Sequence, residues 1–368
     1  MSIDPIFLNS TIHHWLALPH KTFSREESVT QDAIHCDCGG FVRLLFQALQ
    51  LKYPFCVLRP KAVHYFSVLQ EIGSNKITQL KPGHLLAWRK QILPKSGDTG
   101  HIVLITAEPT LVGNNHFRVE IVDATQKQQG LSRRFLELFT DEDSVIIGVR
   151  LHSEETKIKR APIYHCDLLQ TRYCWGCALP KSVCSCAVIE PRSPAPNFVI
   201  LRHPKERKRT LSTVSLIKQR YPTTLVLDGE QFSPLRMNNL LLLFPSQQSL
   251  DWQPNSKSGE SSNHVEKSSE PTLILLDATW KKAKKMLHLN SWLQTLEHVA
   301  LSPDFMSRYL LRKIPNVQGL STLEAYAVAA KDPELAQTLE PFMAKHIELM
   351  GVERYQQNYQ SHLNYENS

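Results

Sequence analysis

Four cysteines crowded into one short segment are the first residues of this sequence that could do chemistry. They form a C-x-x-C pair and a C-x-C pair, at Cys174, Cys177, Cys184 and Cys186. Four thiolates at this spacing can surround one tetrahedral zinc ion, and Gly176 and Pro180 are residues suited to the turns. Four protein ligands leave no position for water, so we expect a structural zinc site. The alternative is four unrelated buried thiols.

Further along comes a strongly basic stretch with the letters RHPKERKR, in which six of the eight side chains are Arg, Lys or His. The stretch closes a predicted strand and opens a predicted helix, and a helix N-terminus already attracts anions. We therefore expect a phosphate-binding site. Its candidate residues are Arg202, His203, Lys205, Arg207 and Arg209. The alternative is an ordinary solvated helix face.

A second basic run follows the tetrapeptide Asp277-Ala278-Thr279-Trp280. It contributes Lys281, Lys282, Lys284 and Lys285. The net charge of +7 says little by itself, since many basic proteins bind no nucleic acid. Two separate basic clusters favour RNA as a partner more than either does alone, because each can neutralise phosphates.

The first part of the chain carries a different candidate. Cys38 begins a helical run, and a thiol at a helix N-terminus is a better nucleophile than an ordinary one. His101 later opens an apolar strand-like run, and Asp123 ends another. The alternative is that Cys38 is a small buried hydrophobe and His101 a surface residue at a strand end. Metal binding by Cys36, Cys38 and His35 is a further alternative.

The elements that would position these residues can be read from the apolar runs. In the first part we expect a helix over 38–51 and strands over 84–88, 102–107 and 118–123. In the second part, short apolar strands alternate with helical segments, which indicates a parallel sheet covered on both faces. The expected strands there are 198–201, 224–227, 240–244, 273–276 and 298–301, and the expected helices are 210–220, 280–287 and 322–330.

Length and composition favour two globular domains. With 368 residues, 42% of them apolar and 21% charged, the chain can bury two ordinary cores. The polar segment 152–160 follows an apolar run and precedes the cysteines. We therefore expect domains over 1–152 and 161–368, with a zinc-binding element over 172–188. The segment 256–271 is rich in Ser, Lys and Glu, and we expect it to be a disordered insertion.

Neither a signal peptide nor a membrane-spanning segment is expected. The N-terminus lacks a basic region followed by an apolar core, and no apolar run is long enough to span a membrane. We therefore expect a cytoplasmic protein, whose reducing surroundings would keep the cysteines as thiols. The sequence carries no signal for a particular oligomeric state.

The tetrapeptide beginning at Asp277 resembles the D-x-T-W signature of the DTW-domain proteins, the tRNA-uridine aminocarboxypropyltransferases. Other motifs of that family stand in the expected order over residues 164–350. They are the cysteine cluster, His203-Pro204-x-Glu206, Leu243-Phe244-Pro245 and Ser321-Thr322-Leu323-Glu324-Ala325. The chain departs from the family in Phe244, where Tyr is more usual, and in its long polar insertion.

This resemblance implies a SPOUT-like α/β domain with a trefoil knot. It also implies the reaction: the 3-amino-3-carboxypropyl group of S-adenosylmethionine moves to N3 of a tRNA uridine, giving acp3U and methylthioadenosine. Uridine N3–H is a weak acid, so the attack needs a base or a charge-stabilising group. Asp277 is our candidate, because it ends an apolar strand, where α/β sheets place ligands. We expect Trp280 to stack on a base or on the adenine.

Structural alternatives stand beside these roles. Asp277 could cap the helix that begins near Trp280, and Trp280 could fill core. Ser321 and Glu324 have the spacing of a capping box that opens a helix. By the resemblance, the cofactor-binding residues are Pro245, Leu276, Ser321, Thr322 and Glu324.

In the first part, the order of Cys38, His101 and Asp123 resembles the NlpC/P60-type papain-like hydrolases over residues 30–150. The resemblance implies that Cys38 is the nucleophile, His101 the base and Asp123 the orienting group. Gly39 stands where Ser is commoner, and His84 replaces the usual Asp. The substrate of such a thiol amidase or peptidase cannot be read from the sequence.

Taken together, these patterns predict an α+β papain-like domain fused to a SPOUT-like transferase domain. Two other interpretations stay open: a cysteine hydrolase with an RNA-binding C-terminal region, and a non-catalytic RNA-binding protein in which both sites are vestigial. Release of methylthioadenosine in the presence of S-adenosylmethionine and unmodified tRNA would support only the first.

Overall fold

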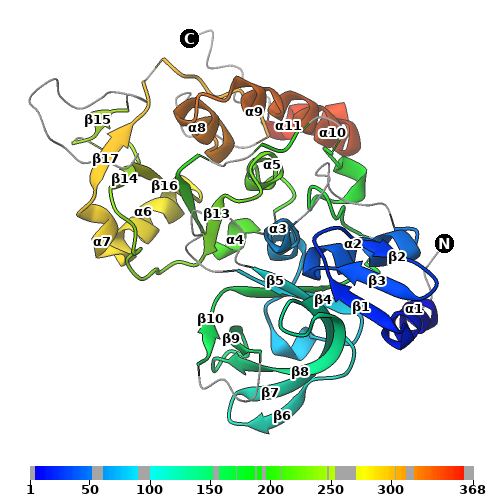
Figure 1. Ribbon diagram of the computed structural model, residues 1–368. Helices are drawn as coiled ribbons and strands as arrows, with labels where there is room; N and C mark the ends of the chain where they lie inside the picture. The colour runs from blue at the N-terminus through cyan, green and yellow to red at the C-terminus, as the bar shows by residue number, and fades with distance from the viewer. Residues whose placement is uncertain are drawn as a thin grey trace, which may run out of the picture. The chain divides into compact units, whose positions relative to one another are not determined.

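The chain divides into two compact units, Met1–Lys181 and Ser182–Ser368, in the computed structural model (Figure 1). The described residues are 5–51, 61–89, 100–151, 157–170, 172–186, 189–192, 196–207, 209–246, 248–252, 271–302, 304–311 and 319–359. The division falls later than the expected 152–160, because β11 (Ile163–Asp167) pairs with β4 (His84–Trp88) in the first unit. The expected insertion lies, except for its last residue, outside the described residues.

A curved antiparallel sheet forms the centre of the first unit. Its strand order is β10-β9-β8-β7-β5-β4-β11, with β6 beside β7. The other strands of this sheet are β5 (His101–Ile105), β6 (Thr110–Gly113), β7 (His116–Thr125), β8 (Gly130–Thr140), β9 (Ile146–Arg150) and β10 (Lys159–Arg160). A smaller sheet has the order β1 (His20–Phe23), β3 (Ala33–Cys36) and β2 (Ser28–Val29).

Both faces of the larger sheet are buried, because successive side chains of a strand point to opposite faces. Leu85 packs with the helices α1 (Pro5–Ala17), α2 (Cys38–Ala48) and α3 (Ala62–Ile72), whereas the next residue, Leu86, joins a second core. The expected helix and three expected strands of this unit are confirmed to within a few residues.

The second unit is built on a parallel sheet with the order β13-β12-β16-β14-β17-β15. Its strands are β12 (Phe198–Arg202), β13 (Leu225–Asp228), β14 (Leu240–Leu243), β15 (Leu250–Asp251), β16 (Thr272–Asp277) and β17 (Glu297–Ala300). Its helices are α4 (Pro204–Arg207), α5 (Val214–Arg220), α6 (Trp280–Leu289), α7 (Ser291–Gln294), α8 (Thr322–Ala329), α9 (Pro333–Gln337), α10 (Leu339–Met350) and α11 (Val352–Tyr359).

Helices cover both faces of this sheet, as its apolar strands predict. On β12, Val199 shares a core with Met286 of α6, while the ring of Phe198 lies 4.3 Å from that of Tyr326 on α8. The five strands expected from the sequence are confirmed, and β15 is an additional short one. No helix in the part of the chain described by the structure is both long and apolar enough to cross a membrane.

Candidate functional site

Three neighbouring strands bring polar residues to one edge of the parallel sheet. The strands β12, β13 and β16 end at Arg202, Asp228 and Asp277, and Arg202 is in register with both acids. From β12 the chain passes to β13 on one side and later to β16 on the other. The carboxyl ends of strands at such a switch point are where open α/β sheets bind ligands.

The basic stretch after β12 divides into a buried and an exposed part. Arg202 is fully buried and donates to both carboxylate oxygens of Asp228, at 2.7 and 3.3 Å. His203 is also buried, and its Nε2 lies 2.9 Å from Oε1 of Glu230. These two residues hold the sheet edge together, so the exposed phosphate-binding site expected from this stretch does not include them.

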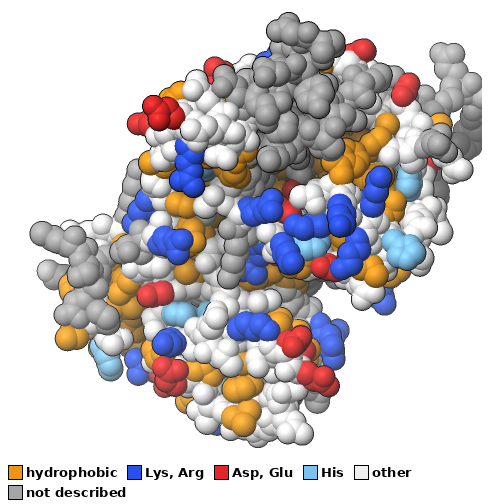
Figure 2. All heavy atoms as spheres, turned by 180° about the vertical axis from the view of Figure 1, so that it is seen from behind, with side chains coloured by type: hydrophobic (Ala, Val, Ile, Leu, Met, Phe, Trp, Pro, Cys, Tyr) orange, Lys and Arg blue, Asp and Glu red, His pale blue; other side chains and the backbone are white. Residues whose placement is uncertain are grey.

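The remaining residues of this stretch and those of the second basic run belong to α4, α6 and the segment after α4. Lys and Arg side chains gather on this face of the second unit (Figure 2). The two basic runs meet at Glu206, whose carboxylate accepts from Lys282 at 2.6 Å and pairs with Arg209 at 3.2 Å. We call this surface the basic face. Its exposed or half-exposed members are Lys205, Arg207, Arg209, Lys281, Lys282, Lys284 and Lys285.

Asp277 is held in place by a residue that is distant in sequence. Its Oδ1 accepts a hydrogen bond from the hydroxyl of Thr322 at 2.6 Å, and its side chain is nearly buried. Thr322 is the first residue of α8, so two of the sequence motifs meet here. The N-cap position of α6 is Thr279 and not Asp277.

Ser321 and Glu324 form the capping box predicted at the start of α8. The Ser321 hydroxyl accepts from the Glu324 amide at 3.2 Å, and Glu324 Oε2 accepts from the Ser321 amide at 2.7 Å. Glu324 also accepts from the Ser307 hydroxyl at 2.8 Å and the Arg308 amide at 2.6 Å. Glu324 therefore fixes the preceding loop against α8.

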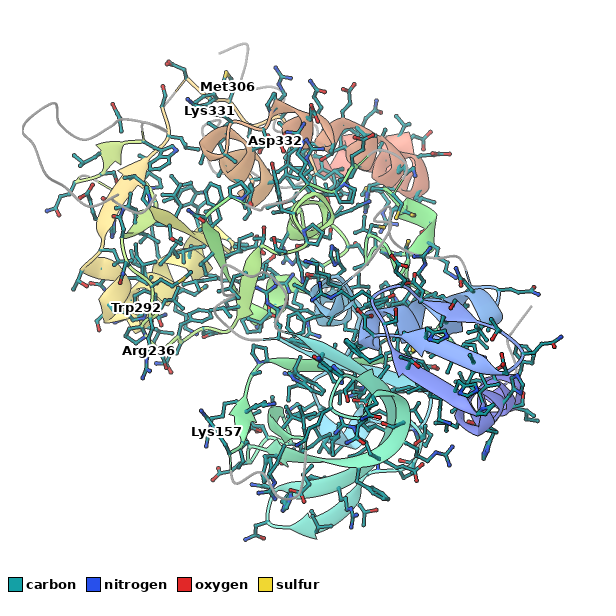
Figure 3. All side chains as sticks on the ribbon, in the orientation of Figure 1. Lys157, Arg236, Trp292, Met306, Lys331 and Asp332 are labelled. Carbon is teal, nitrogen blue, oxygen red and sulfur yellow. The ribbon has the colours of Figure 1, made fainter. Side chains whose placement is uncertain are left out.

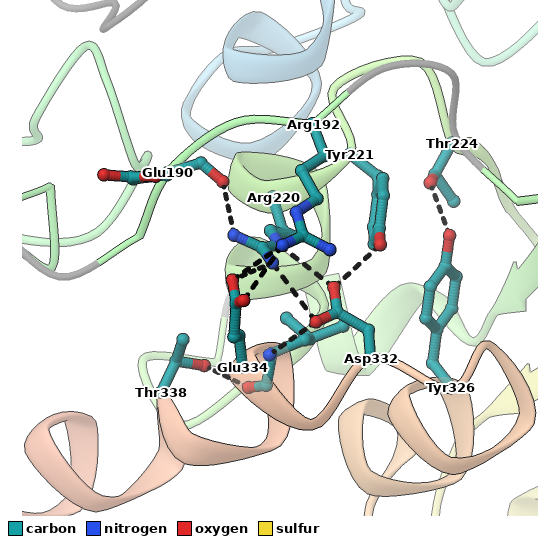
Figure 4. A network of polar contacts seen from close by, with 10 residues as sticks. Glu190, Arg192, Arg220, Tyr221, Thr224, Tyr326, Asp332, Glu334 and Thr338 are labelled. Carbon is teal, nitrogen blue, oxygen red and sulfur yellow. Dashed lines mark hydrogen bonds and ion pairs between the residues drawn. The ribbon is translucent and has the colours of Figure 1, made fainter.

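A buried polar network anchors the other end of α8. Lys331 and Asp332 lie in the turn between α8 and α9 (Figure 3). Asp332 Oδ2 accepts from Nε of Arg220 at 3.0 Å and from the Tyr221 hydroxyl at 2.7 Å (Figure 4). Burial raises the pKa of Asp332, but the hydrogen bonds from Arg220 and Tyr221 outweigh burial and lower it. An ionised carboxylate thus ties α8 to α5.

Trp280 begins α6 and is half-buried. Its ring lies 5.7 Å from that of Phe244, and Leu276 packs against the same core. Pro245, the next residue after Phe244, is exposed. One side of the Trp280 ring therefore packs into the core, which agrees with the structural alternative for this residue. The other side stays accessible, three residues after Asp277.

The four cysteines of the C-x-x-C and C-x-C pairs come together. Their sulfur atoms all lie within 4.8 Å of one another. A tetrahedral zinc with Zn–S bonds of about 2.3 Å needs sulfurs about 3.8 Å apart, so the donor set fits this metal. The Gly176 amide donates to Cys174 Sγ at 3.4 Å, and the turn uses a left-handed residue at Ala178 (φ 61°).

In the first unit, the structure brings Cys38, His101 and Asp123 together. Cys38 begins α2, whose N-cap Asp37 accepts from the Gly40 amide at 2.7 Å. His101 opens β5, and its Nε2 lies 2.6 Å from Oδ2 of Asp123 on the neighbouring β7. The Cys38 sulfur lies close enough to His101 to raise the pKa of the imidazole. The three residues have the order of contacts of a nucleophile, a base and an orienting acid.

Arg134 of β8 completes this cluster, and the sequence gave no sign of it. Its Nε and Nη2 donate to the two carboxylate oxygens of Asp123 at 2.9 and 2.5 Å, and its Nη1 donates to the Leu151 carbonyl at 2.7 Å. Arg133 precedes it in the sequence. Only the pairing of β8 with β7 decides which of the two arginines faces Asp123.

The charges of this cluster follow from its contacts. Burial lowers the pKa of His101, but the nearby Cys38 sulfur and the hydrogen bond to Asp123 outweigh burial and raise it to about 9. Burial raises the pKa of Asp123, and the hydrogen bonds from His101 and Arg134 outweigh this and lower it. At neutral pH the imidazole is therefore protonated and the carboxylate is ionised.

The second unit is a parallel α/β domain in which a buried carboxylate, Asp277, stands at the carboxyl end of β16. Residues 171–351 match the family model described as the DTW domain. The chain is 30% identical over 174 residues to the tRNA-uridine aminocarboxypropyltransferase 2 of Mus musculus, and 34% identical over 176 residues to the protein of that name in Drosophila melanogaster. It belongs to the DTW-domain family.

These similarities cover only part of each protein. The aligned region is 46% of this chain and 58% of the mouse protein, and 45% of this chain and 70% of the fly protein. The chain thus spans little more than half the length of the mouse relative. No solved structure matches the chain.

Proposed function

We propose that the second unit transfers the 3-amino-3-carboxypropyl group of S-adenosylmethionine to N3 of a uridine in tRNA, giving acp3U and methylthioadenosine. The observation that carries this proposal is the position of Asp277. It is the first residue of the D-x-T-W motif, ends β16 at the switch point, and accepts a hydrogen bond from Thr322. The mouse and fly relatives, which are named tRNA-uridine aminocarboxypropyltransferase 2, support the same reaction.

The reaction requires a group that accepts the N3 proton of the uridine, and Asp277 is that group. As N3 forms its bond to the carbon next to the sulfonium, the C–S bond breaks and methylthioadenosine leaves as a neutral molecule. The N3 proton passes to the carboxylate of Asp277, which acts as a general base. The hydrogen bond from Thr322 fixes the direction of that carboxylate, and the exposed part of Trp280 offers a flat surface for a base or the adenine.

We place the donor between the end of β16 and the start of α8. Leu276 and Thr322 are half-buried and Pro245 is exposed, so these residues are accessible to a ligand. Ser321 and Glu324 are buried and bonded to protein groups, so their part is to shape the start of α8.

We infer that tRNA lies on the basic face. Lys281 and Lys282 follow directly from the D-x-T-W motif, so phosphates bound there would hold the substrate close to Asp277. Lys205 and Arg207 of α4, and Arg209 shortly after this helix, extend the same face. Arg202 and His203 are buried against Asp228 and Glu230 and do not lie on this face.

We also propose a structural zinc ion on Cys174, Cys177, Cys184 and Cys186. Four thiolates would complete its coordination, so the ion would stabilise the fold and take no part in transfer. For the folds, we propose a SPOUT-like knotted domain in the second unit, supported by its two-sided parallel sheet. We propose a papain-like domain in the first, supported by α2 packing on an antiparallel sheet.

Mass spectrometry of tRNA nucleosides tests the proposed reaction in cells. Cells that lack the protein should lose acp3U from their tRNA, and re-expression should restore it. An unchanged level of acp3U in the absence of the protein would contradict the proposal and favour a non-catalytic RNA-binding protein.

A further inference from the structure

We propose that the outer face of β7, β8 and β9 in the first unit binds a single-stranded nucleic acid. Two phenylalanine rings stand among arginines on this face, and the three strands lie side by side in the sheet (Figure 1). The face includes neither Asp277 nor the basic face of the second unit. It therefore goes beyond the proposed transfer reaction, and either proposal can fail without the other.

The register of β7 and β8 decides which side chains share this outer face. Directly opposite residues of two antiparallel strands point to the same side of the sheet. The residues between them, such as Val119, Leu136 and Leu138, are buried in the core on the other side. The side chains of the outer face are half-buried or exposed, and they are His116, Arg118, Glu120, Arg133, Phe135, Glu137, Phe139 and, from β9, Arg150.

Phe135 is the more accessible of the two rings, with 47% of the residue exposed. The guanidinium carbon of Arg118 lies 4.1 Å from the centre of this ring, within the range of cation–π attraction. The attraction holds the flat guanidinium next to an exposed aromatic surface. Proteins that bind unpaired bases stack them on aromatic rings and on guanidinium planes of this kind.

The second ring, Phe139, is held between two basic side chains. The ring of His116 is stacked on it, with centroids 4.5 Å apart and planes 12° apart, and the guanidinium carbon of Arg150 lies 5.3 Å from its centre. Glu137 binds both basic groups, since its carboxylate lies 3.1 Å from His116 Nε2 and accepts from Arg150 Nε at 2.5 Å. These contacts hold the planar groups in fixed positions before any ligand arrives.

The charges of the outer face favour an anionic partner. Glu120 pairs with Arg133 at 3.8 Å and accepts from the Thr106 hydroxyl at 2.7 Å. The outer face thus holds three arginines and two glutamates, and the exposed Arg160 of the adjacent β10 adds a fourth arginine. Phosphate groups would supply the missing negative charge, and side chains that are already held in place lose little freedom on binding.

A single strand of nucleic acid matches both features of this face. An acidic peptide would neutralise the arginines but offers no base to stack on the rings. The bases of a duplex are already paired and stacked, so they cannot lie flat on Phe135. A single strand supplies phosphates and unpaired bases together, and neither contact requires a particular sugar.

Binding of a fluorescent oligocytidylate to the full-length protein tests the proposal. An oligonucleotide of about 12 nucleotides is within the site size of single-strand binders and offers no uridine for transfer. We expect Phe135→Ala to weaken its binding about 5–100-fold, the loss of one stacked base, while Phe135→Tyr keeps the ring and binds nearly as well as the parent protein. Phe7→Ala is the matched control, because Phe7 on α1 is 50% exposed and should not affect binding.

Two further measurements separate this face from the basic face. Phe135→Ala should leave the binding of a guanosine–cytidine duplex unchanged, whereas Arg207→Ala with Arg209→Ala should weaken both ligands. Arg118→Gln should lower the slope of log K against log salt concentration for the oligocytidylate by about 0.7, the value for one phosphate contact on a single strand. Ultraviolet crosslinking followed by mass spectrometry should place the oligocytidylate on the peptide that contains Phe135.

The result that would overturn the proposal is equal affinity of Phe135→Ala and the parent protein for the oligocytidylate. Crosslinks that all lie outside β7, β8 and β9, or no binding of the oligocytidylate at low salt, would overturn it as well. None of these results would affect the proposed transferase, whose test is the formation of acp3U.

Discussion

Asp332 and Glu334 are two partners of one arginine, and replacing each in turn gives a matched pair of variants. Both carboxylates bind Arg220, but the side chain of Asp332 is 2% exposed and that of Glu334 is 58% exposed. Asp332 accepts two hydrogen bonds from Arg220, at 3.0 and 3.2 Å, one from Tyr221 at 2.7 Å and one from the Leu335 amide at 3.1 Å. Removal of one partner from a buried ion pair costs about 3–5 kcal/mol. A surface pair contributes about 0–1 kcal/mol.

We therefore expect Asp332→Asn to destabilise α8 by about 3–5 kcal/mol and Glu334→Gln to have a much smaller effect, because water screens the exposed pair. Hydrogen exchange of the α8 amides in the full-length protein measures both, because each 1.4 kcal/mol changes the opening constant tenfold. The Asp332 variant should exchange at least roughly 100-fold faster than the parent protein. Equal effects of the two substitutions would refute the argument that burial decides the strength of this network.

Three further results are expected. Cys177→Ser should lose the zinc found by elemental analysis and destabilise the DTW domain, residues 171–351; freshly purified parent protein without zinc would contradict the site. The double substitution Arg207→Ala and Arg209→Ala should lower the slope of log K for tRNA binding against log salt concentration by about one for each lost phosphate contact. Arg354→Ala on α11 is the control and should leave the slope unchanged. Burial lowers the pKa of His165 from 6.5 to about 4. Protonation therefore costs the folded protein more than the unfolded chain, and the first unit is most stable above pH 6.5, where His165 is neutral in both states. About 3 kcal/mol should be lost as the pH falls toward 4, and His165→Gln should abolish that loss in urea denaturation.

Much of the second unit could be predicted because its signals are local. Consecutive apolar residues mark β12, β13, β14, β16 and β17, and the spacing of Ser321 and Glu324 marks the start of α8. The strand end at Asp277 also places that residue at the ligand-binding edge, since carboxyl ends of parallel strands share one edge.

What the sequence did not reveal depends on partners that only the fold supplies. The Arg202 side chain is of the type that binds phosphate, but it ends a buried strand and pairs with Asp228 on the neighbouring strand. Arg134 joins the Cys38 cluster only because β8 pairs with β7 in one particular register. The division between the units falls after the expected residues 152–160, because β11 pairs with β4 in the sheet of the first unit.

The most direct test of the proposed transferase is the rate of methylthioadenosine release by the parent protein and by Asp277→Asn, with S-adenosylmethionine and unmodified tRNA. Asn has the size of Asp, and its amide oxygen can still accept the hydrogen bond from Thr322, so the melting temperature should stay close to that of the parent protein. Loss of the base should lower the rate by about 10²–10⁴-fold, with little change in the binding of S-adenosylmethionine. A stable Asp277→Asn protein that releases methylthioadenosine at the parent rate would contradict the account.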